Sequence, residues 1–295
     1  MTGVDDSFPQ MQSEIDALPD WSVLHEEGRW LVALAHADEV PRIVAEIGRL
    51  REVAFRAAGE GTGREVDLDR FDGWYSHLFV WDREKQAVAG AYRLADTESF
   101  RPHELPQGLY THTLFAYGQA FLERLGPALE LGRAFVRPEY QRSSRALALL
   151  WLGIARVLAR CEGRRRLFGA VSVSARYTPA ARACIAAAVL AHHRHGDTRA
   201  LVHARTPWAA HLPPPRDVRE LADPARLDAA VRALEADGAG LPVLVRRYLE
   251  LGGEFAAGHV DRAFAESLDL LMILDPARAD TGRLARMGVT AEIAA

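Results

Sequence analysis

An α/β fold built on a sheet of mixed direction is the fold class that the sequence predicts. Strand-like segments alternate with amphipathic helical segments along most of the chain, and a hairpin-like pair of strands precedes that alternation. A chain of 295 residues is long enough for two domains or for one large α/β domain with a lid. The sequence shows no internal repeat and no low-complexity tract.

The first half of the chain predicts a strand, a helix and a hairpin. The apolar run 29–35 is a short strand, and residues 37–59 carry apolar side chains at the spacing of an amphipathic helix. Glycines at 59, 61 and 63 then end the helix in a loop. Residues 75–82 and 87–95 are apolar strands separated by a short polar turn, which indicates an antiparallel hairpin.

The second half continues the alternation of helices and strands. The segments predicted there are a helical region over Leu109–Leu125, a strand at 128–136, a helix from about Ser144 to Cys161, a strand at 166–174, a helix at 179–193, a helix at 242–255 and a last strand at 267–275. From these segments we expect a weakly ordered lead-in over 1–28, an α/β core over 29–205, a proline-rich lid or linker over 206–238, and a C-terminal helix and strand over 239–295 that complete the fold.

Composition limits the classes of function. A net charge of -4 argues against a dedicated nucleic-acid binder, whose surface is normally basic. Two cysteines without metal-ligand spacing fit a reducing compartment, and neither a secretory signal nor a bilayer-spanning run is expected. We therefore expect a cytoplasmic protein, with peripheral contact at the inner face of the membrane left open. The cluster His192, His193 and His195 lacks further ligands at suitable spacing, so no metal is expected.

A turn after the strand 128–136 concentrates positive charge. Nine arginines but only two acids lie between Arg133 and Arg166. The strand ends at Val136, and the turn Gln141-Arg142-Ser143-Ser144-Arg145 leads into the next helix. Unpaired N–H groups at a helix start, with two serines and two arginines beside them, favour a phosphate. The alternative is an ordinary capped helix with solvated arginines.

Taken together with their neighbours, these residues resemble a known family. The turn is similar to the pantetheine-binding loop of GNAT-fold acyltransferases. The segments "RLREVAFRAAGEGTGREVDLDRFDGWYSHLFVWD", "AYRL", "LELGRAFVRPEYQ", "LFGAVSVS" and "LPVLVRRYLELGGEF" resemble the hemolysin-like GNAT branch that contains the ornithine N-acyltransferases of bacterial aminolipid synthesis. The resemblance covers about residues 30 to 287. It implies a GNAT-type sheet, mostly antiparallel and flanked by helices, with a GNAT-like core over 29–205.

The same branch resembles the acyl-homoserine-lactone synthases at seven positions. Those positions are filled here by Arg51, Phe55, Asp69, Asp72, Arg93, Glu130 and Arg133. The resemblance implies a fatty-acyl donor on acyl carrier protein or coenzyme A, an amine acceptor, and no bound cofactor. Ser144 stands where small-molecule acetyltransferases have glycine, which would hinder a pyrophosphate more than the single phosphodiester of a carrier protein. The local arginine excess also suits an acidic carrier partner.

Acyl transfer from a thioester to an amine needs help with proton transfer. Glu130 is the candidate general base or proton relay, and Arg133 is assigned to the catalytic site with it. A regular strand would point the two side chains to opposite faces, so we expect a bulge near Gly132 that brings them together. Such a bulge would also free an N–H for the thioester oxygen. The alternative is that Glu130 is a structural carboxylate paired with Arg133.

The remaining matched residues are assigned to the acceptor side. Asp69 and Asp72 either bind the acceptor's ammonium group or pair with Arg51 and Arg93, which we expect to order the site. Phe55 is either a pocket wall or plain core.

The sequence thus predicts an N-acyltransferase that transfers a fatty acyl group to ornithine, a related amino acid or a lipid amine. Two alternatives stay open. One is a non-catalytic GNAT-like module that binds acyl carrier protein or lipid, and the other is an O-acyltransferase that acts on a lysolipid. The second lacks support because the HxxxxD arrangement of glycerolipid acyltransferases is missing: His112, for one, is followed by Tyr117 at that spacing.

Overall fold

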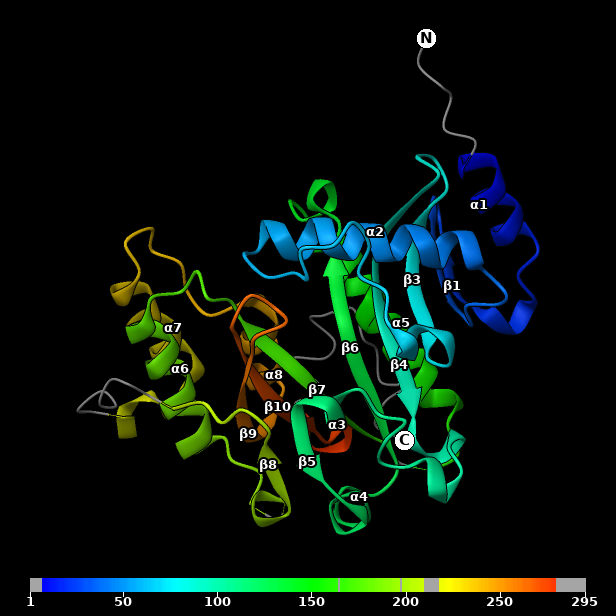
Figure 1. Ribbon diagram of the computed structural model, residues 1–295. Coiled ribbons are helices and arrows are strands. Elements are labelled where there is room, and N and C mark those ends of the chain that lie inside the picture. The colour runs from blue at the N-terminus through cyan, green and yellow to red at the C-terminus, as the bar shows by residue number, and fades with distance from the viewer. Residues whose placement is uncertain (1–6, 164, 197, 210–217, 280–295) are drawn as a thin grey trace.

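A single open sheet of eight strands organises the molecule (Figure 1). The computed structural model describes residues 7–163, 165–196, 198–209 and 218–279. In sheet order, the strands are β1 (Val23–Glu27), β2 (Trp30–Ala35), β3 (Ser76–Asp82), β4 (Ala87–Asp96), β6 (Ala128–Val136), β7 (Arg166–Val173), β10 (Ser267–Leu274) and β9 (Glu254–Asp261). All neighbours are antiparallel except β6 and β7. The mostly antiparallel sheet predicted from the sequence is confirmed.

Helices cover both faces of this sheet. They are α1 (Ser7–Asp16), α2 (Pro41–Ala57), α3 (Thr111–Leu114), α4 (Gln119–Leu125), α5 (Arg145–Arg160), α6 (Pro179–His192), α7 (Pro224–Leu234) and α8 (Val243–Glu250). Helices α5 to α8 share the main core with one face. On the other face, α1 and α2 cover the β1 side of the sheet, and α3 and α4 cover the β9 side together with a small sheet of β5 (Phe115–Tyr117) and β8 (Val202–Ala204).

Local sequence explains the central elements well. Strands β3 and β4 are apolar because both of their faces are covered, and they pair in the predicted hairpin. Helix α5 turns Leu150, Trp151 and Ile154 into the main core. It can approach the sheet closely because a Cβ on Gly153 would lie 2.6 Å from the Leu78 side chain.

Three expectations need correction. The supposed weakly ordered lead-in 1–28 holds α1 and the edge strand β1, where Met11, Ile15 and Leu24 are buried. The region Leu109–Leu125 is not one helix, because β5 interrupts it to pair with β8, which lies far along the chain. The C-terminal unit has two strands, since β9 forms against β10 despite its weak strand sequence Ala256-Ala257-Gly258.

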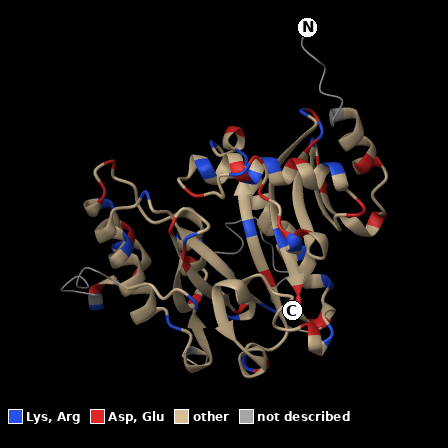
Figure 2. Ribbon diagram, viewed as in Figure 1, with Lys and Arg blue, Asp and Glu red and all other residues tan. Residues whose placement is uncertain are grey.

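The proline-rich segment 206–238 lies partly outside the described residues, as does the end of the C-terminal unit after 279. Within the described part, α7 buries Leu227 and Val231 in the main core, so that stretch is a packed helix. Among the described residues, none of the helices has the length and apolarity needed to cross a bilayer. In the same residues, no three or more His, Cys, Asp or Glu side chains are arranged so that they could hold a metal ion. Acidic and basic residues are interspersed over the molecule in the view of Figure 2.

Candidate active site

Strands β6 and β7 separate soon after they meet. They pair only where Ala128–Glu130 faces Arg166–Phe168, although both strands continue for several residues beyond that point. The two strands still lie very close together one residue later, because a Cβ on Gly169 would lie 2.1 Å from the carbonyl oxygen of Leu131. Glu130 is therefore placed at the point where the two parallel strands divide.

The predicted bulge lies on β6 directly after this point. Ala91 pairs with Phe135 and Arg93 with Gly132, so β6 uses one residue more than β4 over the same length. Arg133 has a positive φ of 50°, which is uncommon for a residue other than glycine. The bulge near Gly132 is thus present and redirects the Arg133 side chain.

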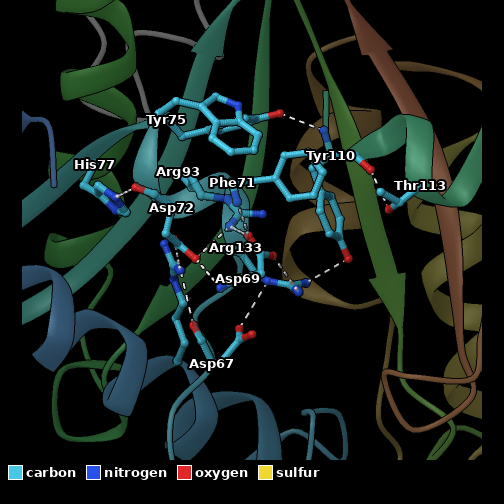
Figure 3. A network of polar contacts seen from close by, with 12 residues as sticks. Asp67, Asp69, Phe71, Asp72, Tyr75, His77, Arg93, Tyr110, Thr113 and Arg133 are labelled. Carbon is cyan, nitrogen blue, oxygen red and sulfur yellow. Dashed lines mark hydrogen bonds and ion pairs between the residues drawn. The ribbon is translucent and has the colours of Figure 1, made fainter. Parts of the chain in front are cut away.

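Beside the bulge, a buried network joins the aspartates of the loop 67–72 to arginines from three elements (Figure 3). Arg51 Nη1 of α2 lies 2.6 Å from Asp72 Oδ1. Arg93 Nη1 of β4 lies 2.6 Å from Asp69 Oδ1 and 2.9 Å from Asp72 Oδ2. Both arginines are fully buried. Burial by itself would raise the pKa of Asp72, but Arg51 and Arg93 outweigh it and lower that pKa to about 2.

Arg133 extends this network toward Tyr110. Its Nε lies 3.2 Å from Asp67 Oδ2, and its Nη1 donates a hydrogen bond of 3.2 Å to the Tyr110 hydroxyl. The guanidinium carbon also lies 4.7 Å from the centre of the Tyr110 ring. Burial raises the pKa of Tyr110 to about 12, so the hydroxyl keeps its proton at neutral pH.

Glu130 binds the backbone of the segment that contains Tyr110 and Thr111. Its carboxylate accepts hydrogen bonds from the Tyr75 hydroxyl, from Tyr110 N at 3.1 Å and from Thr111 N at 2.6 Å. The side chain is buried, and burial raises the pKa of Glu130 above its ordinary value. Among the described residues, no ion pair joins Glu130 to Arg133. The bulge brings them to the same face, where they hold Tyr110 between them.

Residue types alone did not indicate Asp67, Tyr75, Tyr110 or Thr111. Asp67 could have been found, because it stands two residues before Asp69 in the same acidic loop. The others are brought to Glu130 by tertiary structure. Phe55 packs edge to face on Phe264 at 5.1 Å and belongs to the core, although Arg133 lies over the other ring of that pair.

With this geometry in view, the chain can be compared with known proteins. Residues 50–152 match the model of the acetyltransferase (GNAT) domain. An L-ornithine N(alpha)-acyltransferase from Brucella abortus is 31% identical over 267 residues, which cover 84% of this chain and 86% of that protein. The chain belongs to the GNAT acyltransferase family.

Two further similarities are more limited in extent. A glycine N(alpha)-acyltransferase from Phocaeicola vulgatus is 38% identical over 149 residues, and the match spans 46% of this chain but less than half, 45%, of that protein. The crystal structure of the AHL synthase LasI aligns with 50% of this chain and 74% of its own, at 16% identity and a TM-score of 0.35. A likeness that slight carries no argument.

In this GNAT acyltransferase, the predicted donor loop lies on the surface after β6. Gln141, Arg142, Ser143, Ser144 and Arg145 are all exposed. Gln141 Nε2 donates to the carbonyl oxygen of Val136 at 2.7 Å. Ser143 Oγ accepts the N–H of Arg145 at 3.1 Å, whereas Ser144 occupies the N-cap position without a capping bond from its side chain.

The positive charge of the donor loop is partly neutralised. Arg145 forms an ion pair with Glu27 of β1, and Arg137 pairs with Glu139 at 3.0 Å. A separate cavity of about 360 Å³ lies at the opposite, N-terminal end of β6. It is lined by Leu125, Gly126, Pro127, Arg165, Arg166, Asp275 and Arg278.

Proposed function

We propose that this chain is an N-acyltransferase that transfers a fatty acyl group from acyl carrier protein, or from acyl-coenzyme A, to the α-amine of ornithine or a related amino acid. The observation that carries the proposal is the identity with an L-ornithine N(alpha)-acyltransferase over 84% of the chain. Glycine is a second candidate acceptor because of the 38% identity with a glycine N(alpha)-acyltransferase. As part of this proposal, the reaction takes place in the cytoplasm, with peripheral contact at the inner face of the membrane.

The divided strands support a thioester site at this position. Where β6 and β7 separate, their facing edges have backbone groups that no longer pair with each other, and an extended pantetheine arm can use them. The bulge leaves one β6 residue outside the ladder, which offers an N–H to the thioester oxygen. The proposed donor loop lies at the end of β6, where it would hold the phosphate of the arm.

Roles for the site residues follow from their contacts. Glu130 is proposed as the proton relay. The Tyr75 hydroxyl donates to its carboxylate and accepts the N–H of Tyr110, and Arg133 holds the hydroxyl of the same Tyr110. Arg51, Arg93, Asp69 and Asp72 are proposed to order the acceptor side by fixing the loop 67–72. Phe55 is proposed to support Phe264 beneath Arg133.

Intact-mass analysis of the reaction products tests the function directly. The protein is incubated with long-chain acyl carrier protein or acyl-coenzyme A and with ornithine, glycine or a lysolipid. We expect an N-acyl amino acid that depends on the protein and on the donor. Tight binding of the acylated carrier without product from any amine would instead favour a binding module, and an acylated lysolipid would favour O-acyl transfer.

The preference for a carrier protein predicts a separate effect at Ser144. Because Ser144 has φ of -75°, its backbone does not require glycine, and the side chain can be removed without strain. We expect Ser144→Gly to raise kcat/KM for acyl-coenzyme A about fivefold, a change of about 1 kcal/mol, and to change the value for acyl carrier protein less than twofold. Ser144→Ala is the control for loss of the hydroxyl alone. Equal changes with both donors would contradict the steric argument.

A further inference from the structure

Asp269 is a buried carboxylate on the face of the sheet that carries Glu130. Side chains alternate along β10, and Leu271 and Ile273 pack in the cluster that contains Phe168 of β7. Phe168 pairs with Glu130 across the parallel strands, so all of these side chains lie on one face. Asp269 follows the same alternation. Its side chain therefore shares the face on which Glu130 contacts Tyr110 and Thr111.

Along the strands, Asp269 lies beside the opening between β6 and β7. It stands directly opposite Ser172 of β7. Ser172 is four residues after Phe168, the last residue of β7 that pairs with β6. Asp269 thus neighbours the part of β7 from which β6 has separated. The charge of Asp269 also contributes to the raised pKa of Tyr110, which Glu130 and Arg133 hold, and of Glu60 in the loop after α2.

Two serine hydroxyl groups stabilise this charge at close range. Ser267 Oγ lies 3.1 Å from Asp269 Oδ1, and the Ser172 hydroxyl also donates to the carboxylate. Among the described residues, no ion pair joins Asp269 to a cation. Arg133 and Arg182 act on it from a distance, and Arg133 is already paired with Asp67. A buried carboxylate without a cation is costly to folding, and such groups concentrate at functional sites.

The surroundings keep Asp269 close to its protonation midpoint at neutral pH. Burial raises the pKa of Asp269 to about 7; Asp261 adds to the rise, while Ser172, Ser267 and Arg133 oppose it. His259 stands opposite Asp269 on β9, and burial lowers the pKa of its imidazole. Burial and the charge of Asp269 also raise the pKa of Glu60 to about 7.

We propose that Asp269 is the general base that receives the proton of the acceptor's ammonium group. The proposal rests on the proposed N-acyltransferase function. Glu130 suits this step less well, because three donors already hold its carboxylate. Asp269 takes one proton from the ammonium group, and the neutral amine attacks the thioester carbonyl. A C–N bond forms, the C–S bond breaks, the thiolate takes a second proton from the nitrogen, and Asp269 releases its proton to solvent.

Asp269→Asn tests this assignment, because asparagine has the same shape and can keep the serine hydrogen bonds. We expect kcat/KM for the amine to fall about 100-fold at pH 7. Wild-type kcat/KM should rise with pH through about 7 and then level off. The kcat/KM of the variant should lack this inflection and rise only as the amine of the free acceptor loses its proton. Donor affinity should change less than twofold.

Thermal stability provides an independent test, because Asp269→Asn should lose activity but gain stability. The pKa of Asp269 is higher in the folded protein than in the unfolded chain, so the folded state gains stability from the protonated form and loses it as pH rises toward about 7. We therefore expect the Tm of Asp269→Asn to exceed that of the wild type at pH 8. A structural carboxylate would give the reverse, with a lower Tm in the variant and an unchanged inflection, and this result would overturn the assignment.

Two further variants complete the test. Ser172→Ala removes a hydrogen bond that lowers the pKa of Asp269, so the inflection should move to higher pH. Asp275→Asn, at the far end of β10, should leave both rate and inflection unchanged. Amide formation by Asp269→Asn within threefold of the wild type overturns only this assignment. Absence of amide product from the wild-type protein would overturn the proposed function together with it.

Discussion

Asp72→Asn is expected to lower the free energy of unfolding by about 3–5 kcal/mol, because it removes the carboxylate shared by two buried arginines. Arg51 has no other ion pair among the described residues, and Arg93 keeps only Asp69. Both guanidinium groups are fully buried, so water cannot replace the lost partner. Urea or thermal unfolding measured by circular dichroism gives the difference.

The matched control is Glu84→Gln, which removes the carboxylate of an exposed pair with Arg29. It should cost less than about 1 kcal/mol, as exposed ion pairs do. A loss at Asp72 no larger than this would show that the buried network does not hold the fold together.

Acid should weaken the same network in the wild type. The pKa of Asp72 is lower in the folded protein, about 2, than in an unfolded chain, about 4. Its contribution to stability is therefore complete above a pH of about 4 and is lost as pH falls through about 2. Asp72→Asn should lack this part of the acid dependence, which a series of unfolding measurements between pH 5 and 2 would show.

Glu130→Gln is expected to reduce acyl transfer at least tenfold, and by as much as the 10² to 10⁴ that proton-transfer groups contribute. The amide cannot accept all three of the present hydrogen bonds, because its NH2 would face the N–H donors of Tyr110 or Thr111. Rates with acyl carrier protein and ornithine, followed by intact mass, measure the loss. Transfer unaffected by the change would remove Glu130 from the chemistry.

Tyr75→Phe separates the relay from the backbone contacts of Glu130. This variant removes the hydroxyl, which donates to the carboxylate and accepts the Tyr110 N–H at 2.8 Å, and leaves in place the hydrogen bonds that Tyr110 N and Thr111 N donate to Glu130. A relay through Tyr75 predicts a fall in kcat with a KM close to that of the wild type. A rise in KM alone would indicate that Glu130 acts by positioning the segment around Tyr110.

The proposed division of roles between Glu130 and Asp269 rests on two carboxylates in different surroundings. Burial raises the pKa of both, but Glu130 is engaged by three donors that include two backbone N–H groups, whereas Asp269 faces serine hydroxyls. Because three donors already occupy the Glu130 carboxylate, it has less room than Asp269 to receive the ammonium group directly. Asp269 remains suited to exchange a proton near neutral pH.

The sequence by itself determined the fold class and the central hairpin, because apolar runs of strand length are local patterns. The residues of the arginine–aspartate network were predicted from the family resemblance at those positions, and the bulge on β6 from the odd spacing of Glu130 and Arg133 once that resemblance assigned both to one site. The sequence also indicated the strand, turn and helix start around residues 141–145, because these are adjacent in the chain, whereas donor binding at this turn stays a prediction.

Only the tertiary structure decided what surrounds Glu130 and where Asp269 lies. Tyr75, Tyr110 and Asp269 reach the site from segments separated by tens to more than a hundred residues, and no local periodicity records that approach. Strand β5 likewise depends on a distant partner, β8, and β9 depends on its hairpin partner β10, rather than on their own residues. Pairing across the sheet supplies the hydrogen bonds that make these segments strands, and burial supplies the pKa of Asp269.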